Sequence, residues 1–318
     1  MEDSLEQYVF HSCSSSSYIN QQVIIQIAQS AGVCYGRNGD NLPSEADVVA
    51  LYKSRGITRM RIYDPNPATL ETLRGSNIEL IVNIFKGNLQ SLNDAGKATE
   101  WVHNYIRAFP DVKFRYIAVG NEVHPNDAEA QFVLPVMRNI QNALSSINLQ
   151  GQIKVSTAID TRLQTGYPPA NGVFTEAANS YITQIIRFLA ENGSPLLANI
   201  YPYFAYVSNL DYQNLFDALL DTLYSALEKA GVPGLKIVVS ESGWPSEGGD
   251  GASVENAGTY YRNLINHVKG GSPKRKEGPI ETYLFAMFDE NKKEGNPVEQ
   301  HFGLFSPNQQ PKYQLNFS

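Results

Sequence analysis

Cysteine and basic residues are scarce in this sequence of 318 residues, and each scarcity excludes a class of protein. The two cysteines, Cys13 and Cys34, can form at most one bridge, so the chain has neither a disulfide framework nor a cysteine-based zinc site. Lys and Arg number 25 against 32 Asp and Glu, and the formal net charge is −7. Because nucleic acids and anionic membranes attract excess Lys and Arg, we expect neither as a partner. A neutral substrate suits this composition better.

Long apolar runs are also missing. None reaches the roughly 18 residues of a membrane-spanning helix, so no membrane span is predicted. The first 28 residues include a serine run at 14–17 and no Lys or Arg, whereas a secretory signal begins with a basic segment followed by an apolar one. We interpret residues 1–28 as a poorly ordered tail or remnant leader and residues 29–318 as one folded domain. The five histidines have no ligand spacing, so we expect no metal.

Short β-branched or aromatic runs alternate with helix-like segments from Ala31 onward. Helical stripes lie between these runs: one begins with Ser44 and Asp47 spaced as in a capping box, and glycines at 56, 231 and 270 follow the ends of three of them. The runs that predict strands are 31–35, 58–64, 78–84, 114–122, 152–158, 196–203, 236–241 and 281–289.

Eight strands alternating with helices predict an α/β fold of one domain, a closed (β/α)₈ TIM barrel. An open doubly wound sheet is the alternative. That fold usually carries a glycine-rich phosphate-binding turn after its first strand, and residues 36–39 (GRNG) match neither the dinucleotide motif nor the P-loop. The barrel is therefore favoured, and nucleotide binding is not expected.

Two glutamates occupy predicted strand ends, where barrels of this kind carry their active sites. Glu122 ends the fourth run and Glu241 the seventh, and both follow apolar residues. A buried ionised carboxylate without a partner costs on the order of several kcal/mol, so each needs a partner or a function. A structural ion pair is the alternative, for which Arg61 and Lys293 are candidates. The position of both glutamates at strand ends favours a functional role over a structural ion pair.

Paired carboxylates indicate glycoside hydrolysis, in which one acid protonates the leaving oxygen and a second carboxylate attacks the anomeric carbon or activates water. A sugar site also needs aromatic faces and an amide, and Asn121 directly precedes Glu122. For each aromatic residue, simple packing is the alternative. The aromatic candidates at or just beyond strand ends are Tyr35, Tyr63, Tyr201, Tyr203, Phe204, Trp244 and Phe288.

Five longer segments stand in order along the chain: 32–36 (GVCYG), 60–63 (MRIY), 119–123 (VGNEV), 239–246 (VSESGWPS) and 301–305 (HFGLF). They closely resemble plant glucan endo-1,3-β-glucosidases of glycoside hydrolase family 17, and the resemblance extends from Ala31 to Ser318. It implies a barrel that hydrolyses β-1,3-glucans such as callose, laminarin and fungal wall glucan with retention of configuration. It also implies a cofactor-free enzyme of plant defence, extracellular or vacuolar, which we expect to be a monomer.

The resemblance assigns roles residue by residue. It implies that Glu122 is the acid/base and Glu241 the nucleophile. The family's Glu, Lys and Glu after the eighth strand correspond to Glu290, Lys293 and Glu299, which would assist through hydrogen bonds to sugar hydroxyls and through their charges. A retaining reaction predicts that the two catalytic carboxyl groups lie roughly 5–5.5 Å apart, whereas about 8 Å favours inversion.

The sequence departs from the family pattern at its leader and after 201–206. After residues 201–206 the family usually carries a longer insertion, whereas here only residues 207–210 precede Asp211. We therefore expect one wall of the cleft to be missing. A mixed-linkage 1,3-1,4-β-glucanase is the alternative among enzymes, because the same barrel and carboxylates serve either linkage. A non-catalytic glucan-binding barrel is the alternative outside them, although a pure binding protein has no need of two such carboxylates.

Overall fold

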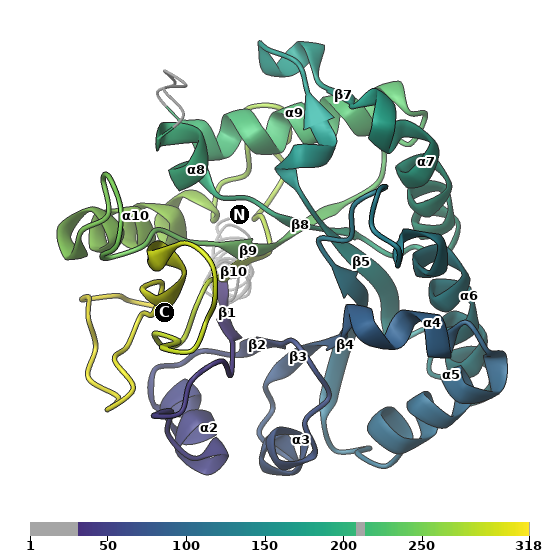
Figure 1. Cartoon of the computed structure of the whole chain (residues 1–318), viewed down its shortest axis with the longest axis horizontal. Helices are drawn as coiled ribbons and strands as arrows, with labels where there is room; N and C mark the ends of the chain where they lie inside the picture. The colour runs from purple at the N-terminus through teal and green to yellow at the C-terminus, as the bar shows by residue number, and fades with distance from the viewer. Residues whose placement is uncertain (1–30, 208–213, 318) are drawn as a thin grey trace, which may run out of the picture.

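The computed structural model describes residues 31–207 and 214–317 and shows a closed barrel of eight parallel strands surrounded by helices (Figure 1). Strands neighbour one another in the order β1-β10-β9-β8-β5-β4-β3-β2, and β1 pairs with β2 to close the ring. The closed barrel is confirmed, and the open doubly wound sheet is excluded. The barrel strands are β1 (Ala31–Tyr35), β2 (Arg59–Ile62), β3 (Glu79–Ile84), β4 (Lys113–Asn121), β5 (Lys154–Asp160), β8 (Leu196–Asn199), β9 (Ile237–Ser242) and β10 (Thr282–Leu284).

Each of the eight predicted runs overlaps one barrel strand, and the runs at 196–203 and 281–289 extend furthest beyond their strands. The run at 196–203 stops being a strand at Asn199, because Pro202 begins helix α8. The run at 281–289 forms only three residues of strand, after which the chain leaves the barrel wall. The predicted tail at 1–28 and most of the predicted short loop after Val207 lie outside the described residues.

Local capping signals explain where the helices begin and end. The Ser44 hydroxyl accepts a hydrogen bond from the Asp47 backbone N–H, as predicted, and Gly56 follows the helix at φ 68°. The helices are α2 (Glu45–Ser54), α3 (Pro67–Leu73), α4 (Leu89–Leu92), α5 (Ala95–Val102), α6 (Ala130–Ser146), α7 (Glu176–Glu191), α8 (Pro202–Val207), α9 (Leu215–Lys229) and α10 (Val254–His267). Shorter turns are η1 (Lys86–Asn88), η2 (His103–Arg107), η3 (Thr161–Leu163), η4 (Pro169–Asn171) and η5 (Pro297–Gln300).

An excursion between β5 and α7 was not predicted. Its strands β6 (Gln164–Thr165) and β7 (Val173–Phe174) form a small antiparallel hairpin that lies against α9 (Figure 1). Gly172 makes this close approach possible, since a Cβ atom there would lie 2.2 Å from the Thr222 carbonyl oxygen. The excursion is therefore docked on α9 and extends the wall of the barrel mouth.

The barrel interior is filled by side chains, and Cys34 is one of them. It is fully buried, its thiol lies 3.3 Å from the Ser240 carbonyl oxygen, and burial raises the pKa of this thiol. The cysteine is thus a small buried side chain rather than a reactive one. None of the helices in the described parts of the chain is long and apolar enough to cross a membrane.

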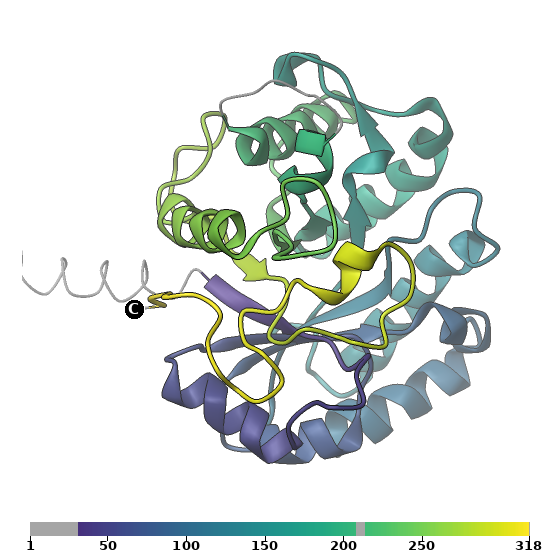
Figure 2. The same ribbon diagram turned by 60° about the vertical axis from the view of Figure 1, so that its left-hand side comes forward.

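The segment after β10 returns to the mouth of the barrel. It lies between α2 and α10, as the yellow chain in Figure 2 shows. Lys312 anchors its far end through two contacts of 2.8 Å to the Asp289 carboxylate and one of 2.7 Å to the Ser246 hydroxyl. This path carries Glu290, Lys293 and Glu299 to the carboxyl ends of the strands.

Candidate active site

The end of β4 turns out of its strand conformation where it presents Glu122. Gly120 has φ 73° and Glu122 has φ 51°, a region that few non-glycine residues adopt. The Glu122 backbone N–H donates to the Ala158 carbonyl of β5 at 2.9 Å, which holds this turn in place. Such strain is typical of functional positions, because the surrounding structure must maintain it.

Three donors surround the Glu241 carboxylate at the end of β9. The hydroxyl of Tyr63 donates to Oε1 at 2.7 Å, and that of Tyr201 donates to Oε2 at 2.7 Å. Arg61 places Nη1 3.0 Å from Oε1. Glu241 is 5% exposed, and its three partners hold its carboxylate in one orientation.

Arg61 is fully buried and joins the strand ends into one network. Its guanidinium donates to Asn83 at 3.1 Å, to Asn121 at 2.7 Å and to Asn199 at 3.0 Å. A further bond of 3.0 Å reaches the Ser240 carbonyl oxygen. Arg61 is therefore the ion-pair partner of Glu241 that the sequence offered as a candidate.

Glu122 has a different environment. Asn199 Nδ2 donates to its Oε1 at 2.8 Å, and Arg162 Nη2 lies 3.6 Å from its Oε2. Burial and, next, the negative charge of Glu241 raise the pKa of Glu122 to about 7. Near neutral pH Glu122 is therefore a carboxyl group that readily carries a proton.

The segment after β10 adds a third carboxyl and a cation. Glu290 is 3% exposed, accepts a hydrogen bond of 2.9 Å from the Asn38 backbone N–H, and has its pKa raised by burial. Lys293 pairs with Glu299 at 3.0 Å, and its Nζ lies 4.2 Å from the centroid of the Phe285 ring. The Lys293 ammonium contacts Glu299 rather than either Glu122 or Glu241.

One cavity of about 1510 Å³ brings most of the predicted site residues together. The excursion between β5 and α7 and the first turns of α9 extend it on one side. Sequence analysis missed many of the lining side chains, among them Phe85, Arg162 and Tyr167; Phe85 directly follows β3, where an aromatic at a strand end was the available signal. The predicted residues on its lining are Tyr63, Asn121, Glu122, Tyr201, Phe204, Glu241, Glu290, Lys293 and Glu299.

Four predicted aromatic residues are not on that lining. Tyr35 and Phe288 are both 2% exposed and contact each other edge to face at 6.3 Å between ring centroids. Tyr203 contacts Trp244 in the same way at 5.2 Å. Tyr35, Tyr203 and Phe288 are buried and Trp244 is half-buried, so these rings contribute to packing rather than to the cavity lining.

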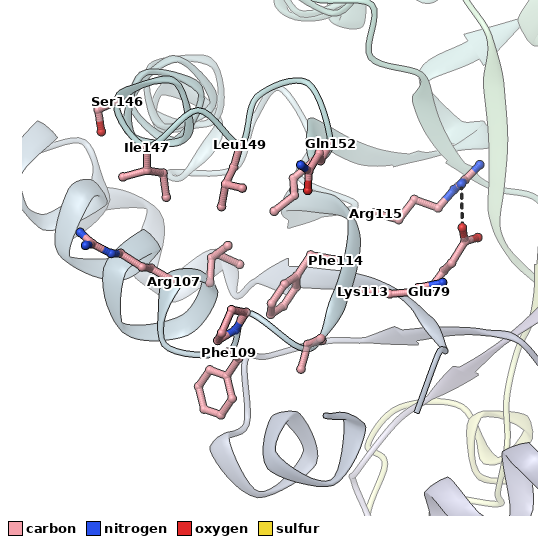
Figure 3. Close-up of a pocket in the computed structure, with 14 residues that line it drawn as sticks. Glu79, Arg107, Phe109, Lys113, Phe114, Arg115, Ser146, Ile147, Leu149 and Gln152 are labelled. Carbon is pink, nitrogen blue, oxygen red and sulfur yellow. Dashed lines mark hydrogen bonds and ion pairs between the residues drawn. The ribbon is translucent and has the colours of Figure 1, made fainter. Parts of the chain in front are cut away.

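A second cavity, of about 760 Å³, lies at the opposite end of the barrel (Figure 3). Its wall includes Lys113, the first residue of β4, and combines apolar with polar side chains, among them the Glu79–Arg115 ion pair at 3.3 Å, but neither Glu122 nor Glu241 lines it. The chemistry therefore belongs to the first cavity. Within residues 31–207 and 214–317, no three His, Cys, Asp or Glu side chains are grouped to hold a metal ion. The absence of a metal or cofactor remains a prediction.

Fold and site together define a class of protein: a (β/α)₈ barrel with two carboxyl groups in different environments at its strand ends has the architecture of a glycoside hydrolase. The chain belongs to the glycosyl hydrolases family 17, whose sequence model matches residues 31–317. A glucan endo-1,3-beta-glucosidase of Vitis vinifera is 60% identical, with 92% of each chain covered. An acidic isoform of Nicotiana tabacum is 54% identical over the same shares.

Solved structures agree. A β-1,3-glucanase and allergen of Cryptomeria japonica pollen is 44% identical and superposes with a TM-score of 0.87, covering 91% of this chain and 99% of that one. A structure described among two plant β-glucan endohydrolases with distinct substrate specificities is 42% identical, with a TM-score of 0.86 and coverage of 90% and 99%.

Proposed function

We propose that this protein is a retaining endo-hydrolase of β-1,3-glucans such as callose, laminarin and fungal wall glucan. The observation that carries the proposal is the contrast between Glu122 and Glu241, which share one cavity but differ in their hydrogen-bond partners and charge. The names of the relatives from Vitis vinifera and Nicotiana tabacum support the linkage.

In the first half of the reaction Glu241 is the nucleophile. Its ionised carboxylate, held by Arg61, Tyr63 and Tyr201, attacks the anomeric carbon and forms a glycosyl ester. The bond from that carbon to the glycosidic oxygen breaks at the same time. Glu122 gives its proton to this oxygen, and the leaving glucan departs with a free hydroxyl group.

In the second half Glu122 acts as the base. The ester at Glu241 carries no charge, so one of the two main causes of the raised pKa of Glu122 is removed and its carboxylate form is favoured. Glu122 takes a proton from water while the water oxygen attacks the anomeric carbon. The Glu241 carboxylate is released, and two inversions restore the original configuration.

Neighbouring groups are arranged to bind the sugar. Asn121 uses its amide oxygen to accept from Arg61 and Asn199, which fixes the side chain and turns its amino group to a sugar hydroxyl. Phe85, Tyr167 and Phe204, at 57%, 69% and 40% exposed, offer aromatic faces along the cavity. Glu290 and the Lys293–Glu299 pair bind hydroxyls on the remaining side, so the cavity supplies both apolar faces and polar groups.

Proton NMR of the products tests activity, linkage and stereochemistry together. The protein is mixed with laminarin and, separately, with barley mixed-linkage glucan, and the first anomer formed is recorded. Early β-anomer from laminarin alone supports the proposal. Early α-anomer contradicts the role of Glu241, and product from barley glucan alone favours the mixed-linkage alternative.

The variant Glu241→Gln separates catalysis from binding. It keeps the size of the side chain, so glucan binding is expected to persist while turnover falls by at least about a thousandfold. Wild-type protein that binds laminarin but releases no product would favour the non-catalytic barrel instead. Loss of both binding and turnover in the variant, with a changed circular dichroism spectrum, would indicate misfolding.

We also propose that the protein acts outside the cell or in the vacuole. Relatives in Nicotiana tabacum are named as acidic isoforms and as a basic vacuolar isoform. A fluorescent fusion of the full chain, expressed in plant cells, tests this location, and a purely cytosolic signal would contradict it.

A further inference from the structure

The end of β5 carries an ion pair that neither the sequence analysis nor the proposed reaction uses. Asp160 is the last residue of β5, and its carboxylate accepts hydrogen bonds from the Arg162 backbone N–H at 2.8 Å and from Arg162 Nε at 2.7 Å. Arg162 Nη2 contacts the same carboxylate. Backbone and guanidinium are thus fixed by one group, so this arginine is more rigid than an ordinary surface arginine.

Asp160 is itself held from the other side. His124, in the loop after β4, places Nε2 2.9 Å from Asp160 Oδ2. The His124 backbone N–H in turn donates to Asp127 at 3.0 Å. The Asp160 side chain is 10% exposed, whereas that of Arg162 is 66% exposed, so a buried carboxylate fixes a guanidinium on the cavity rim.

The same guanidinium nitrogen that contacts Asp160, Nη2, also faces Glu122. Arg162 Nη2 lies 3.6 Å from Glu122 Oε2, the oxygen that Asn199 does not bind. The other charges that act on Glu122 are Glu241 from β9 and Asp160 from β5, with His124 and Asp127 behind Asp160. Glu290 and Lys293 lie on the lining of the same cavity.

We propose that Arg162, held by Asp160, is a positioning residue that orients Glu122 Oε2 and balances the protonated and ionised forms of Glu122 between the two halves of the reaction. The inference rests on the proposed function, since it assigns Arg162 a task only if Glu122 is the acid/base. Arg162 touches Glu122 and acts through it.

The two halves of the reaction need opposite forms of one carboxyl group. Burial and the charge of Glu241 raise the pKa of Glu122, and Asp160 adds to this, whereas Asn199 and the Arg162 guanidinium lower it. Without Arg162, Glu122 would still be a competent acid but a slower base. Because Arg162 is largely exposed, salt should screen its effect.

Arg162→Gln provides the kinetic test. We expect the basic limb of the pH profile of kcat/KM to move upward by about half a pH unit, as expected for losing a partly screened ion pair. With an aryl β-glucan oligosaccharide whose phenol leaves readily, kcat should fall several-fold while kcat/KM changes little, because only hydrolysis of the ester needs the base. Arg162→Lys keeps the charge, so its pH profile and its kcat with the aryl substrate should both lie close to those of the wild type.

A titration that does not depend on turnover is the second test. In protein labelled with ¹³C at the glutamate carboxyl carbon, the resonance absent from Glu122→Gln belongs to Glu122. Its midpoint should rise in Arg162→Gln, and the rise should shrink in 1 M NaCl. Arg107→Gln is the matched control, because Arg107 is exposed and lines the cavity at the opposite end of the barrel.

The outcomes separate the two proposals. Coincident midpoints and pH profiles for wild type and Arg162→Gln would overturn the role of Arg162. An equal shift of the Glu122 midpoint in Arg107→Gln would overturn it too, because the loss of a distant arginine would then have the same effect. If Glu122→Gln keeps wild-type turnover of laminarin, or if the Glu122 midpoint moves while the pH profile does not, the proposed function of Glu122 is wrong.

Discussion

At the scale of single residues, one buried guanidinium decides how the strand ends fit together. Arg61 contacts side chains from β3, β4 and β8 as well as Glu241 on β9. The Arg61 side chain is fully buried, and a buried guanidinium is stable only when acceptors surround it, because an unpaired buried charge is strongly unfavourable. Folding and the orientation of Glu241, the proposed nucleophile, therefore depend on the same side chain.

Replacement of Arg61 by Met should lower the stability of the fold and disturb the orientation of Glu241. We expect the free energy of unfolding to fall by about 3–5 kcal/mol, because Glu241 and the asparagine amides lose their shared partner. Urea denaturation measures this loss, and Arg187→Met on the exposed face of α7 is the control. A fall below about 1 kcal/mol would mean that Glu241 needs no cation beside it.

Glu122 predicts a pH-dependent cost in stability. Its pKa is about 7 in the folded protein against an ordinary value of 4.5, so between these values the folded state holds a proton that the unfolded state releases. Stability contributed by this group therefore decreases as the pH rises from 4.5 to 7.

Glu122→Gln removes that dependence, since an amide does not titrate. In urea denaturation the variant should match wild type near pH 4.5 and exceed it by about 3 kcal/mol at pH 8. A constant difference at the two pH values would contradict the raised pKa.

Site residues were predictable where their position along a strand decides where they lie in the barrel. Glu122 and Glu241 follow apolar runs, so the sequence places them at the barrel mouth. The direction of each side chain was harder to predict. Tyr63 and Tyr201 point to Glu241, whereas Tyr35, equally close to a strand end, is buried and does not line the cavity. Successive side chains alternate in direction, and a shift of one residue in register reverses them.

At the scale of elements, the wall of the cavity depends on the excursion between β5 and α7. Gly172→Ala would place a Cβ atom against the Thr222 backbone and push the hairpin β6–β7 from α9. We expect a loss of about 1–3 kcal/mol in stability and a higher KM for long glucans.

Hydrolysis of a short aryl substrate by Gly172→Ala should keep its kcat, because the carboxylates lie on other strands. Gly151→Ala is a suitable control, since a Cβ atom there meets nothing within 4 Å. An unchanged KM for laminarin would show that substrate does not reach this wall.

Helix starts were predictable because capping is local: Ser44 and Asp47 lie three residues apart in any context. The hairpin β6–β7 was not, because strands of two residues are too short to show an alternating pattern. Its position follows from packing on α9, fifty residues further along the chain.

At the scale of the whole molecule, the barrel separates stability from catalysis by its two ends. Glu281 at the amino end of β10 accepts from Arg115 at 2.8 and 3.0 Å and from Tyr116 and Tyr283 at 3.2 and 3.1 Å. Glu122 and Glu241, the proposed catalytic carboxylates, lie at the other end. The number of strands made closure predictable, whereas the pairing of Glu281 with Arg115 and Tyr116 across the barrel floor was not, because it joins residues 166 and 165 positions apart.

Glu281→Gln should therefore lower the melting temperature without changing kcat/KM. Arg115 loses its main charged partner, and we expect a cost of about 1–3 kcal/mol. Glu100→Gln, exposed on α5, is the control in both assays. A change in kcat/KM greater than about twofold would show that the two ends are coupled.

Closure of the ring also governs the order of events at the ribosome. The last barrel strand to be synthesised, β10, is the one that pairs with both β1 and β9. Until it emerges, the nascent chain exposes two unpaired strand edges, which are sites for aggregation. The site stays incomplete as well, because Glu290 and Lys293 follow β10, so hydrolytic activity is expected to begin only when synthesis of the domain is almost finished.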